Sequence, residues 1–439
     1  TPTCGRSERK PIHMNPMIET FGALVGKAAA KSPDRARRLL EAAFYASNFQ
    51  AKHFPSRKLT TARAFISPVC MDAVLHPLAH PERSAIVNLF LPCEILHAMR
   101  IEPQIAEGLS CYFSGAGSEQ YFIEYARQKG VPDTLCSYHK ILTGIALSGV
   151  LPKPRLIANT TLACDANTNT FRRIAAHYGV PHFTVDTPCA DDADAVQYVA
   201  DQLRELARFT EEAMHERFSE DALRAVLACE QRSMQACRSY YDLLADRYLP
   251  NEMTSEMYTL FATHILLGKP EIEQYFEQLC EDAKNAPVFQ GGNRILWVHS
   301  LPYWQNSLRT ILNFSEENQL LCSDMSFDAL FEPDPEHPYE SMARRLLDNT
   351  FNGPMSRRAD KIAEMALKLH ANGVVFFCHW GCKNTIGGAG LVRDRLEQEG
   401  IPMLTLDGDG CDRRNINDGQ MRTRLEAFLE LLEERRRAR

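Results

Sequence analysis

Cysteine is the residue whose number and spacing most strongly indicate chemistry in this sequence. The 439 residues include 14 cysteines, which are too dispersed for a small fold held together by disulfides. No secretory signal is recognisable at the start of the sequence, so we expect a cytoplasmic protein whose thiols stay reduced. Reduced thiols that gather at one place are candidate metal ligands. The fold then decides which cysteines meet.

Six cysteines stand where a parallel sheet would place a ligand site. In open parallel sheets, ligands bind beyond the carboxyl ends of the strands, where the connecting loops converge. Each of the six ends a predicted strand or lies in a loop that we expect at this edge. They are Cys93, Cys136, Cys322, Cys378, Cys382 and Cys411. We expect these six to be metal ligands.

The other eight cysteines have weaker patterns. Three lie inside helical patterns and are expected in the core: Cys229, Cys237 and Cys280. Five occur in irregular stretches or near the terminus, where a free thiol is the commoner explanation: Cys4, Cys70, Cys111, Cys164 and Cys189.

The spacing of the six candidates favours an iron-sulfur site over a zinc site. A structural zinc site normally shows two close pairs of Cys or His, and the only close pair here is Cys378 and Cys382. The same pair does not complete a radical-SAM triplet, because position 385 is Thr. An iron-sulfur cluster needs only three or four thiolates and imposes no local spacing on them. Coincidental burial of the six thiols is the alternative.

Signatures of other chemistries are missing from the sequence. It contains no G-x-x-x-x-G-K-[ST] loop, no G-x-S-x-G elbow and no H-E-x-x-H motif, which argues against ATP binding through a P-loop and against hydrolases. The net charge of -7 disfavours nucleic acid and anionic lipid as partners. Apolar runs such as 374–377 are far shorter than the roughly 18 residues of a membrane span. We expect no nucleic acid and no membrane among its partners.

The elements that must position the cysteines read as a parallel α/β fold. In the first half, short apolar runs typical of buried parallel strands alternate with helical stretches, at 85–91, 156–158 and 183–185. In the second half, the corresponding runs are 295–298, 320–321, 374–377 and 403–406. The sequence therefore predicts an α/β protein with two parallel-sheet lobes.

Helical regions are expected before and between the two lobes. Apolar spacing predicts helices over 15–48, 193–218 and 220–247, with Ser219 as the N-cap of the last, and further helices before a turn at 290–293. The predicted division is a helical N-terminal region, a first α/β lobe, a helical linker and a second α/β lobe, over residues 1–84, 85–218, 219–290 and 291–439.

Five segments resemble one known family. In the second lobe, the sequences FCHWGCK, GIPMLTLDGD and QMRTRLEAFLE, at 377–383, 400–409 and 420–430, resemble the C-terminal signature of the 2-hydroxyacyl-CoA dehydratase and benzoyl-CoA reductase family. In the first lobe, LPCEILHA at 91–98 and LCSYHK at 135–140 resemble its N-terminal cysteine segments. The resemblance spans about residues 85–434.

The resemblance implies a fold, a cofactor and a partner. Members have two flavodoxin-like lobes with an oxygen-sensitive iron-sulfur cluster between them, and a separate ATP-hydrolysing activator with its own cluster supplies low-potential electrons. By motif position, Cys93, Cys136 and Cys382 would hold one 4Fe-4S cluster of the dehydratase type. A second set of three exceeds that pattern and is similar to the double-cubane branch, with an 8Fe-9S cluster: Cys322, Cys378 and Cys411.

The six-cysteine count therefore favours a double-cubane protein, an ATP-coupled reductase of small molecules that forms a homodimer. One alternative is a 2-hydroxyacyl-CoA dehydratase subunit with a single 4Fe-4S cluster, paired with a paralogous subunit. Another is a cluster-carrying scaffold for electron transfer. His139, His379 and Lys383 flank the expected ligands and are candidate catalytic proton donors, with a structural role as the alternative. We find no CoA signature in the sequence.

Overall fold

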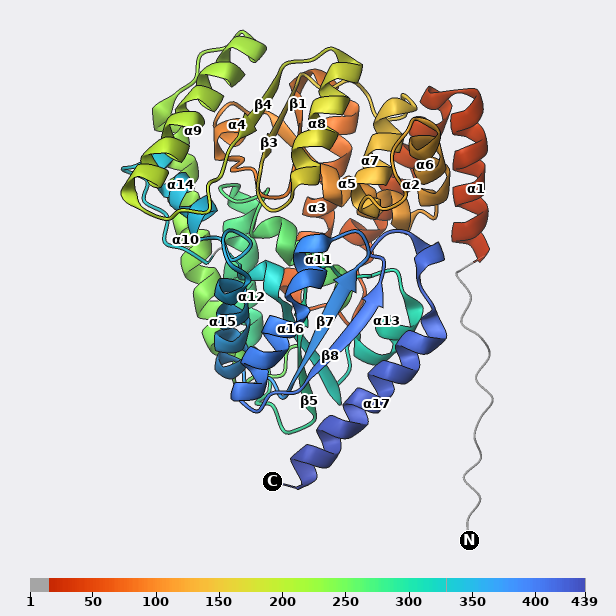
Figure 1. Cartoon of the computed structure of the whole chain (residues 1–439), viewed down its shortest axis with the longest axis vertical. Coiled ribbons are helices and arrows are strands. Elements are labelled where there is room, and N and C mark those ends of the chain that lie inside the picture. Colours follow the sequence, from red (N-terminus) through yellow and green to blue (C-terminus); the bar gives the residue numbers. More distant parts are fainter. Residues whose placement is uncertain (1–15, 329, 439) are drawn as a thin grey trace.

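The computed structural model describes residues 16–328 and 330–438, and its core is two four-stranded parallel sheets (Figure 1). The first sheet has the order β2-β1-β3-β4, with β1 (Ser84–Val87), β2 (Glu102–Ile105), β3 (Leu156–Thr160) and β4 (His182–Val185). The second repeats it as β6-β5-β7-β8, with β5 (Asn293–Val298), β6 (Asn318–Ser323), β7 (Gly373–His379) and β8 (Met403–Gly408). The predicted α/β fold with two parallel-sheet lobes is confirmed.

Helices cover both sheets. Those of the first lobe are α4 (Glu94–Ala98), α5 (Ala106–Gly115), α6 (Glu119–Gln128), α7 (Ser137–Leu147) and α8 (Asp165–Tyr178). Those of the second are α13 (Asn306–Leu312), α14 (Pro338–Asp348), α15 (Met355–Lys368), α16 (Lys383–Gln398) and α17 (Asp418–Arg437).

Three helices precede the first sheet: α1 (Pro16–Lys31), α2 (Pro33–His53) and α3 (Thr61–Ala79). The pattern predicted as one helical region from residue 15 to 48 is divided at Ser32. The Ser32 side chain accepts a hydrogen bond from the Arg35 backbone N–H, and Pro33 fits the first turn of α2 because it has no N–H to satisfy there. Residues 1–15, with Cys4, lie outside the described residues.

Four helices run between the two sheets: α9 (Ala193–Met214), α10 (Glu220–Leu244), α11 (Met253–Ala262) and α12 (Pro270–Asn285). The predicted N-cap is confirmed, because the Ser219 side chain accepts a hydrogen bond from the Ala222 backbone N–H. Helix α9 packs on α14 of the second lobe, and α12 packs on both α10 and α3. These helices therefore link the lobes in sequence and also pack against helices on both sides of the link.

Two strands differ from the sequence prediction for identifiable reasons. β1 ends at Val87, because the Asn88 side chain accepts a hydrogen bond from Thr160 N–H and donates one to the Leu162 carbonyl. The rest of the predicted strand leaves the sheet. β2 was not predicted because it contains Pro103, which a strand tolerates at an edge position such as this one.

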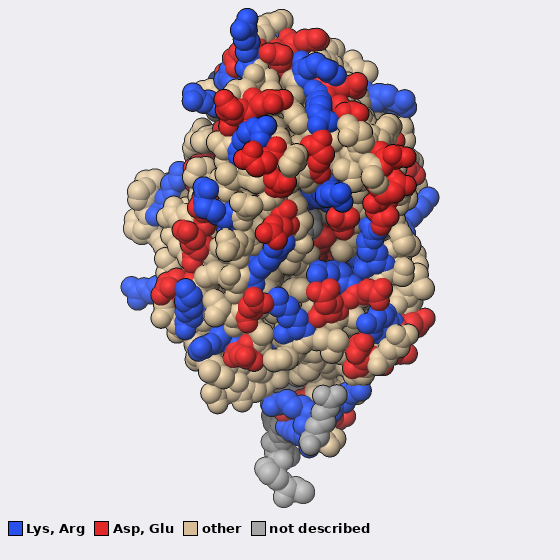
Figure 2. All heavy atoms as spheres, turned by 90° about the vertical axis from the view of Figure 1, so that its left-hand side faces the viewer, with Lys and Arg blue, Asp and Glu red and all other residues tan. Residues whose placement is uncertain are grey.

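The lobes have dense aromatic and aliphatic cores and a mixed surface. In the second lobe the Trp297 and Phe377 rings are fully buried and stacked, with 5.9 Å between their centroids. On the face drawn in Figure 2, basic and acidic side chains are interspersed. Among the described helices, none combines the length and the apolar character needed to cross a membrane.

Candidate functional site

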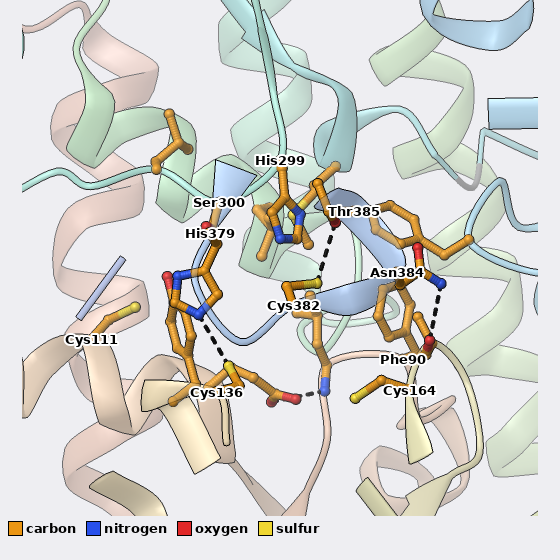
Figure 3. A pocket seen from close by; sticks show the side chains of 18 of the residues that line it. Phe90, Cys111, Cys136, Cys164, His299, Ser300, His379, Cys382, Asn384 and Thr385 are labelled. Carbon is orange, nitrogen blue, oxygen red and sulfur yellow. Dashed lines mark hydrogen bonds between the residues drawn. The ribbon is translucent and has the colours of Figure 1, made fainter. Parts of the chain in front are cut away.

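A cavity lies where the carboxyl ends of the two sheets face each other. In the first sheet, the chain leaves β1 toward β2 on one side and leaves β3 toward β4 on the other side, so the switch point lies between the adjacent strands β1 and β3. In the second sheet, the switch point lies between β5 and β7 in the same way. Residues from the loops after these four strands line the same cavity, including Phe90, Cys164, His299 and Cys382 (Figure 3). It encloses about 940 Å³, counting the space that is open to solvent. One site thus draws on both lobes.

Three thiols that face this cavity each stand at the start of a helix. Cys136 is the N-cap residue of α7, Cys164 of α8 and Cys382 of α16. The Cys136 thiol is close enough to interact electrostatically with both others, and Cys164 interacts with Cys382. The positive ends of three helix dipoles therefore converge on the place where the thiols meet, which favours negative charge there.

Each of these thiols has a polar side chain beside it. His379 Nε2 lies 3.1 Å from Cys136 Sγ, and His139 Nε2 lies 3.8 Å from Cys164 Sγ. Cys382 Sγ lies 3.3 Å from the Thr385 hydroxyl oxygen. Figure 3 shows the His379 and Thr385 contacts as dashed lines. Such neighbours can stabilise a thiolate by donating hydrogen bonds to it.

The proton on His379 can be assigned from its contacts. The Gly410 backbone N–H donates to His379 Nδ1 over 2.9 Å, so Nδ1 is the acceptor nitrogen. Burial lowers the pKa of His379, which keeps the ring neutral despite the nearby Asp409 carboxylate. In the neutral ring the other nitrogen carries the proton. His379 Nε2–H therefore donates toward the Cys136 sulfur.

Burial also keeps two of these thiols, Cys136 and Cys164, protonated. It raises the pKa of Cys136 well above its ordinary value, with the neighbouring Cys382 and Cys164 adding to the effect, and it raises the pKa of Cys164 to about 11. Burial lowers the pKa of His139 to about 4, so this ring is neutral at pH 7. Metal ions bind thiolates, so a metal bound here would displace thiol protons.

The rest of the cavity is mostly apolar, and its further ionisable groups include Glu107 and His299. Glu107, in the first turn of α5, has its pKa raised by burial to about 7, and its carboxylate accepts a hydrogen bond from Leu89 N–H over 3.0 Å. His299 has a positive φ of 77°, and its Nδ1 lacks a hydrogen-bond partner among the described residues. A carboxyl group that titrates near neutral pH can take up or release a proton during a reaction.

Four of the nine predicted site residues line the cavity: Cys136, Cys382, His139 and His379. Cys411 is adjacent, because its thiol contacts Cys111, which is in the lining. The exposed Lys383 begins α16 outside the lining.

The structure does not bring the other three predicted ligands to the cavity. Cys93 caps α4, where it is buried and its thiol donates to the Leu91 carbonyl. Cys322 lies within β6, and its thiol faces Cys237 and Tyr241 of α10. Cys378 precedes His379 in β7, so the two side chains point to opposite faces of the sheet.

The sequence did not assign four of the cavity residues to a site: Glu107, Cys111, Cys164 and His299. Cys164 follows β3, a strand that was predicted, so the rule of strand ends would have found it. Glu107 and Cys111 belong to α5, which follows the unpredicted β2. His299 directly follows β5 and fits the same rule. Within the described residues, no three His, Cys, Asp or Glu side chains are grouped to hold a single metal ion.

Two facing parallel-sheet lobes with a shared cavity of thiols and imidazoles define a two-lobed α/β protein with its site at the lobe junction. A model of the family described as 2-hydroxyglutaryl-CoA dehydratase, D-component, matches residues 88–432. The chain belongs to this family, which confirms the resemblance seen in its sequence.

Characterised relatives are similar along most of their length. The (R)-phenyllactyl-CoA dehydratase alpha subunit of Clostridium sporogenes is 20% identical over 367 residues, covering 78% of this chain and 87% of the relative. The lactoyl-CoA dehydratase subunit alpha of Anaerotignum propionicum is 21% identical over 356 residues, covering 71% and 81%. The (R)-2-hydroxyisocaproyl-CoA dehydratase alpha subunit of Clostridioides difficile is 20% identical over 336 residues, covering 72% and 81%.

These relatives overturn the expectation of a double-cubane, ATP-coupled reductase. All are named as dehydratase subunits, so the enzyme class expected first, an oxidoreductase, is wrong as the main reading. The expectation depended on counting six cysteines around one cleft. Of those six, only Cys136 and Cys382 line the cavity, so the number of cysteines at strand ends did not give the number of ligands at one site.

Proposed function

We propose that this chain is a subunit of a 2-hydroxyacyl-CoA dehydratase, a lyase, and that Cys136, Cys164 and Cys382 hold one iron-sulfur cluster in it. The observation that carries the proposal is the meeting of these three thiols at one cavity between the lobes. The family membership and the names of the relatives support the reaction class.

The residues fit a cluster better than a lone ion. The absence of a single-ion group among residues 16–328 and 330–438 agrees with thiols that are spread around a cavity, because a cluster is much wider than one ion. Three converging helix N-termini offset the negative charge of three thiolates. When bound, the cluster would supply the low-potential electron for radical dehydration of a thioester.

Residues of the chain would control protons and water around the substrate. Glu107, with its pKa of about 7, can exchange a proton with substrate in the cavity. His379 donates a hydrogen bond toward Cys136, which tunes the electron density on that sulfur. Apolar side chains such as Phe90, Phe261 and Phe351 exclude water from the same space, which protects reactive species.

Partners follow from the same proposal. The relatives are alpha subunits, which supports pairing of this chain with a paralogous subunit and not with a second copy of itself. An ATP-hydrolysing iron-sulfur activator would deliver the electron. Trp380 and Lys383 are exposed on either side of Cys382, which supports docking of the activator at this loop.

The test begins with anaerobic iron and sulfide analysis of the purified chain. We expect about four irons per chain, and we expect Cys136→Ser, Cys164→Ser and Cys382→Ser each to lose most of this iron. Cys93→Ser and Cys322→Ser are the matched controls and should keep it. Iron loss in Cys93→Ser with retention in Cys164→Ser would restore the ligand set expected from the sequence and refute the proposed one.

Activity is tested separately with the paralogous subunit, the activator, ATP and a low-potential donor. The probes are (R)-phenyllactyl-CoA and lactoyl-CoA, and the readout is the formation of the corresponding unsaturated acyl-CoA. Dehydration of either probe is expected to disappear in Cys164→Ser. A fully iron-loaded complex that dehydrates neither probe would refute the proposed substrate class.

A further inference from the structure

Besides the three thiols of the proposed cluster, two further thiols lie next to each other at the junction of the two lobes. Cys111 belongs to α5 of the first lobe, and Cys411 follows β8 of the second. They are 6% and 0% exposed, and both are free cysteines. Their thiols are close neighbours, because after burial the Cys111 side chain is the main cause that raises the pKa of Cys411. Residues that are three hundred positions apart in sequence thus present their sulfur atoms to each other.

The backbones around this pair are held together across the junction. The Ser114 hydroxyl donates to the Cys411 carbonyl over 2.9 Å, and Arg413 donates to the Ser114 carbonyl over 2.5 Å. Ser114 lies three residues after Cys111 and so on the same face of α5. The loop after β8 is therefore fixed to the helix face from which the Cys111 side chain extends.

Two aromatic side chains of the loop after β5 complete the joint. The Tyr303 hydroxyl donates to the Cys111 carbonyl, and the Trp304 indole N–H donates to the Gly410 carbonyl over 2.7 Å. The backbones next to both thiols are thus anchored to the same loop. A disulfide requires two cysteine backbones at a fixed short separation, and two neighbouring thiols whose backbones are anchored to the same loop need little movement to meet that requirement.

One of the two sulfurs can be reached from the cavity. Cys111 is part of the cavity lining, whereas Cys411 is fully buried behind it. A small reagent in the cavity would therefore meet Cys111 first and Cys411 only through Cys111.

We propose that Cys111 and Cys411 are a redox modification site, at which a low-molecular-weight disulfide that enters the cavity is exchanged for an interlobe disulfide. The Cys111 thiolate attacks the reagent disulfide and expels one thiol, which leaves a mixed disulfide on Cys111. The Cys411 thiolate then attacks the Cys111 sulfur and expels the second thiol. The two cysteines are oxidised, the reagent is reduced to two thiols, and the protons lost by the cysteines are taken up by those thiols.

The disulfide would act on the cavity through a short chain of contacts. Gly410, next to Cys411, donates its backbone N–H to His379 Nδ1, and His379 Nε2 contacts Cys136. A bond from Cys411 to α5 would fix the loop that holds His379 in place. Oxidation of the pair would therefore restrict the position of the His379 side chain beside Cys136, although neither cysteine of the pair is a proposed cluster ligand.

The test uses the full chain, purified without oxygen and incubated with hydroxyethyl disulfide. Free thiols are then alkylated, and the chain is digested without reduction and mapped by mass spectrometry. We expect a linked peptide pair that contains Cys111 and Cys411, lighter by two hydrogen atoms than the separate peptides. The matched control is another pair of neighbouring cysteines, Cys237 in α10 and Cys280 in α12, which lie outside the cavity lining. Both should stay reduced and be found alkylated.

Two variants test the order of the steps. In Cys411→Ser, the reaction should stop at the mixed disulfide, seen as a reagent adduct on the Cys111 peptide. In Cys111→Ser, Cys411 should stay a free thiol. If neither variant folds, the map of the unaltered chain alone decides. Full alkylation of Cys111 and Cys411 after treatment, or linkage of Cys111 to Cys136 or Cys164, would overturn the proposal. None of these readouts depends on iron content or dehydratase activity, so the two proposals fail independently.

Discussion

Glu107 is the cavity residue whose ionisation most clearly lowers the stability of the folded protein. Its carboxyl group is buried, and its pKa of about 7 shows that the surroundings disfavour the charged form. The groups that face it are the Leu89 N–H and His264, which favour the charge, and the Cys164 thiol. The group proposed for proton exchange is thus held where its ionisation costs stability.

Replacing this carboxyl should stabilise the protein in a pH-dependent way. With its pKa raised in the folded state, Glu107 binds its proton more tightly there than in the unfolded chain, and this contribution to stability is lost as pH rises through about 7. Glu107→Gln has no charge to bury. We expect its free energy of unfolding at pH 8 to exceed that of the unaltered protein by on the order of 2 kcal/mol, with a smaller difference at pH 5.

Denaturant unfolding at both pH values measures this difference, with both proteins in the same iron-loading state. The proposed dehydratase activity should fall in Glu107→Gln even as the stability of the variant rises. An advantage that is the same at pH 5 and pH 8 would show that the effect comes from packing and not from ionisation.

Single residues also show what the sequence could and could not predict about the site. Cys136 and Cys382 were recognisable because they follow loops and strands that the pattern made visible. Cys164 also follows a predicted strand, but the stretch around it shows no regular pattern, so it was grouped with the free thiols. Cys93 has the motif context of a ligand, yet its thiol donates to the Leu91 carbonyl and is not part of the cavity lining. Side-chain direction after a strand depends on loop conformation, which periodicity does not encode.

At the scale of elements, the loop between β7 and α16 depends on a glycine. Gly381 has a φ of +84°, and a Cβ built on it would lie 2.7 Å from the Cys136 Cα and 2.8 Å from the Cys136 N. Only a residue without a side chain lets this loop approach the start of α7 so closely. The meeting of Cys382 with Cys136 therefore depends on Gly381.

Gly381→Ala should push the two loops apart. We expect a loss of about 1 to 3 kcal/mol in the free energy of unfolding, from the positive φ and the contact with backbone, together with reduced iron binding. Thermal unfolding and iron analysis measure the two effects. The matched control is Gly390→Ala in α16, where an added Cβ meets nothing within 4 Å and should stabilise the helix by about 0.5 to 1 kcal/mol. Equal behaviour of the two variants would contradict this role of Gly381.

Elements were predicted well where burial alone decides them. Three strands of the second lobe, β5, β6 and β7, are fully or largely buried, the edge strand β8 is only partly buried, and apolar runs predicted all four. Apolar residues also continue past the end of β1, since Leu89 and Phe90 line the cavity. Burial in a cavity wall and burial in a sheet look alike in sequence, so the end of that strand depended on the hydrogen bonds of Asn88.

At the scale of the whole molecule, a buried ion cluster links the two lobes through the connecting helices. Arg345 of α14 is 7% exposed and contacts both Glu94 of α4 and Glu230 of α10. Burial, followed by the nearby Glu94, raises the pKa of Glu230 well above its ordinary value. The guanidinium therefore bridges two buried carboxyl groups at a place where burial disfavours their charged forms.

Removing this cation should destabilise the assembly of the lobes. We expect Arg345→Met to lower the free energy of unfolding by about 3 to 5 kcal/mol, because it leaves buried carboxyl groups without a partner. Denaturant titration gives the value. The exposed pair of Arg395 with Asp360 provides the control, and Arg395→Met should cost about 0 to 1 kcal/mol. A similarly small loss in Arg345→Met would mean that the carboxyl groups protonate without cost.

The general architecture could be predicted from the sequence, whereas the contacts between the two lobes could not. Alternating apolar runs and helical stretches predicted two parallel sheets, and each sheet has the same strand order. Which loops meet across the junction depends on how α9 to α12 position the second lobe against the first. That relation comes from packing between distant segments, so the number of cysteines at strand ends could not reveal the content of the cavity.

The division of the proposed ligands between the lobes has a consequence for how the protein is made. Cys136 and Cys164 leave the ribosome with the first lobe, and Cys382 follows only after all the connecting helices and most of the second lobe. A nascent chain thus has an incomplete set of thiols for most of its synthesis. With this ligand set, delivery of iron and sulfide would be a maturation step that follows the synthesis of most of the chain, and a metal-free precursor would precede every cluster-bearing molecule.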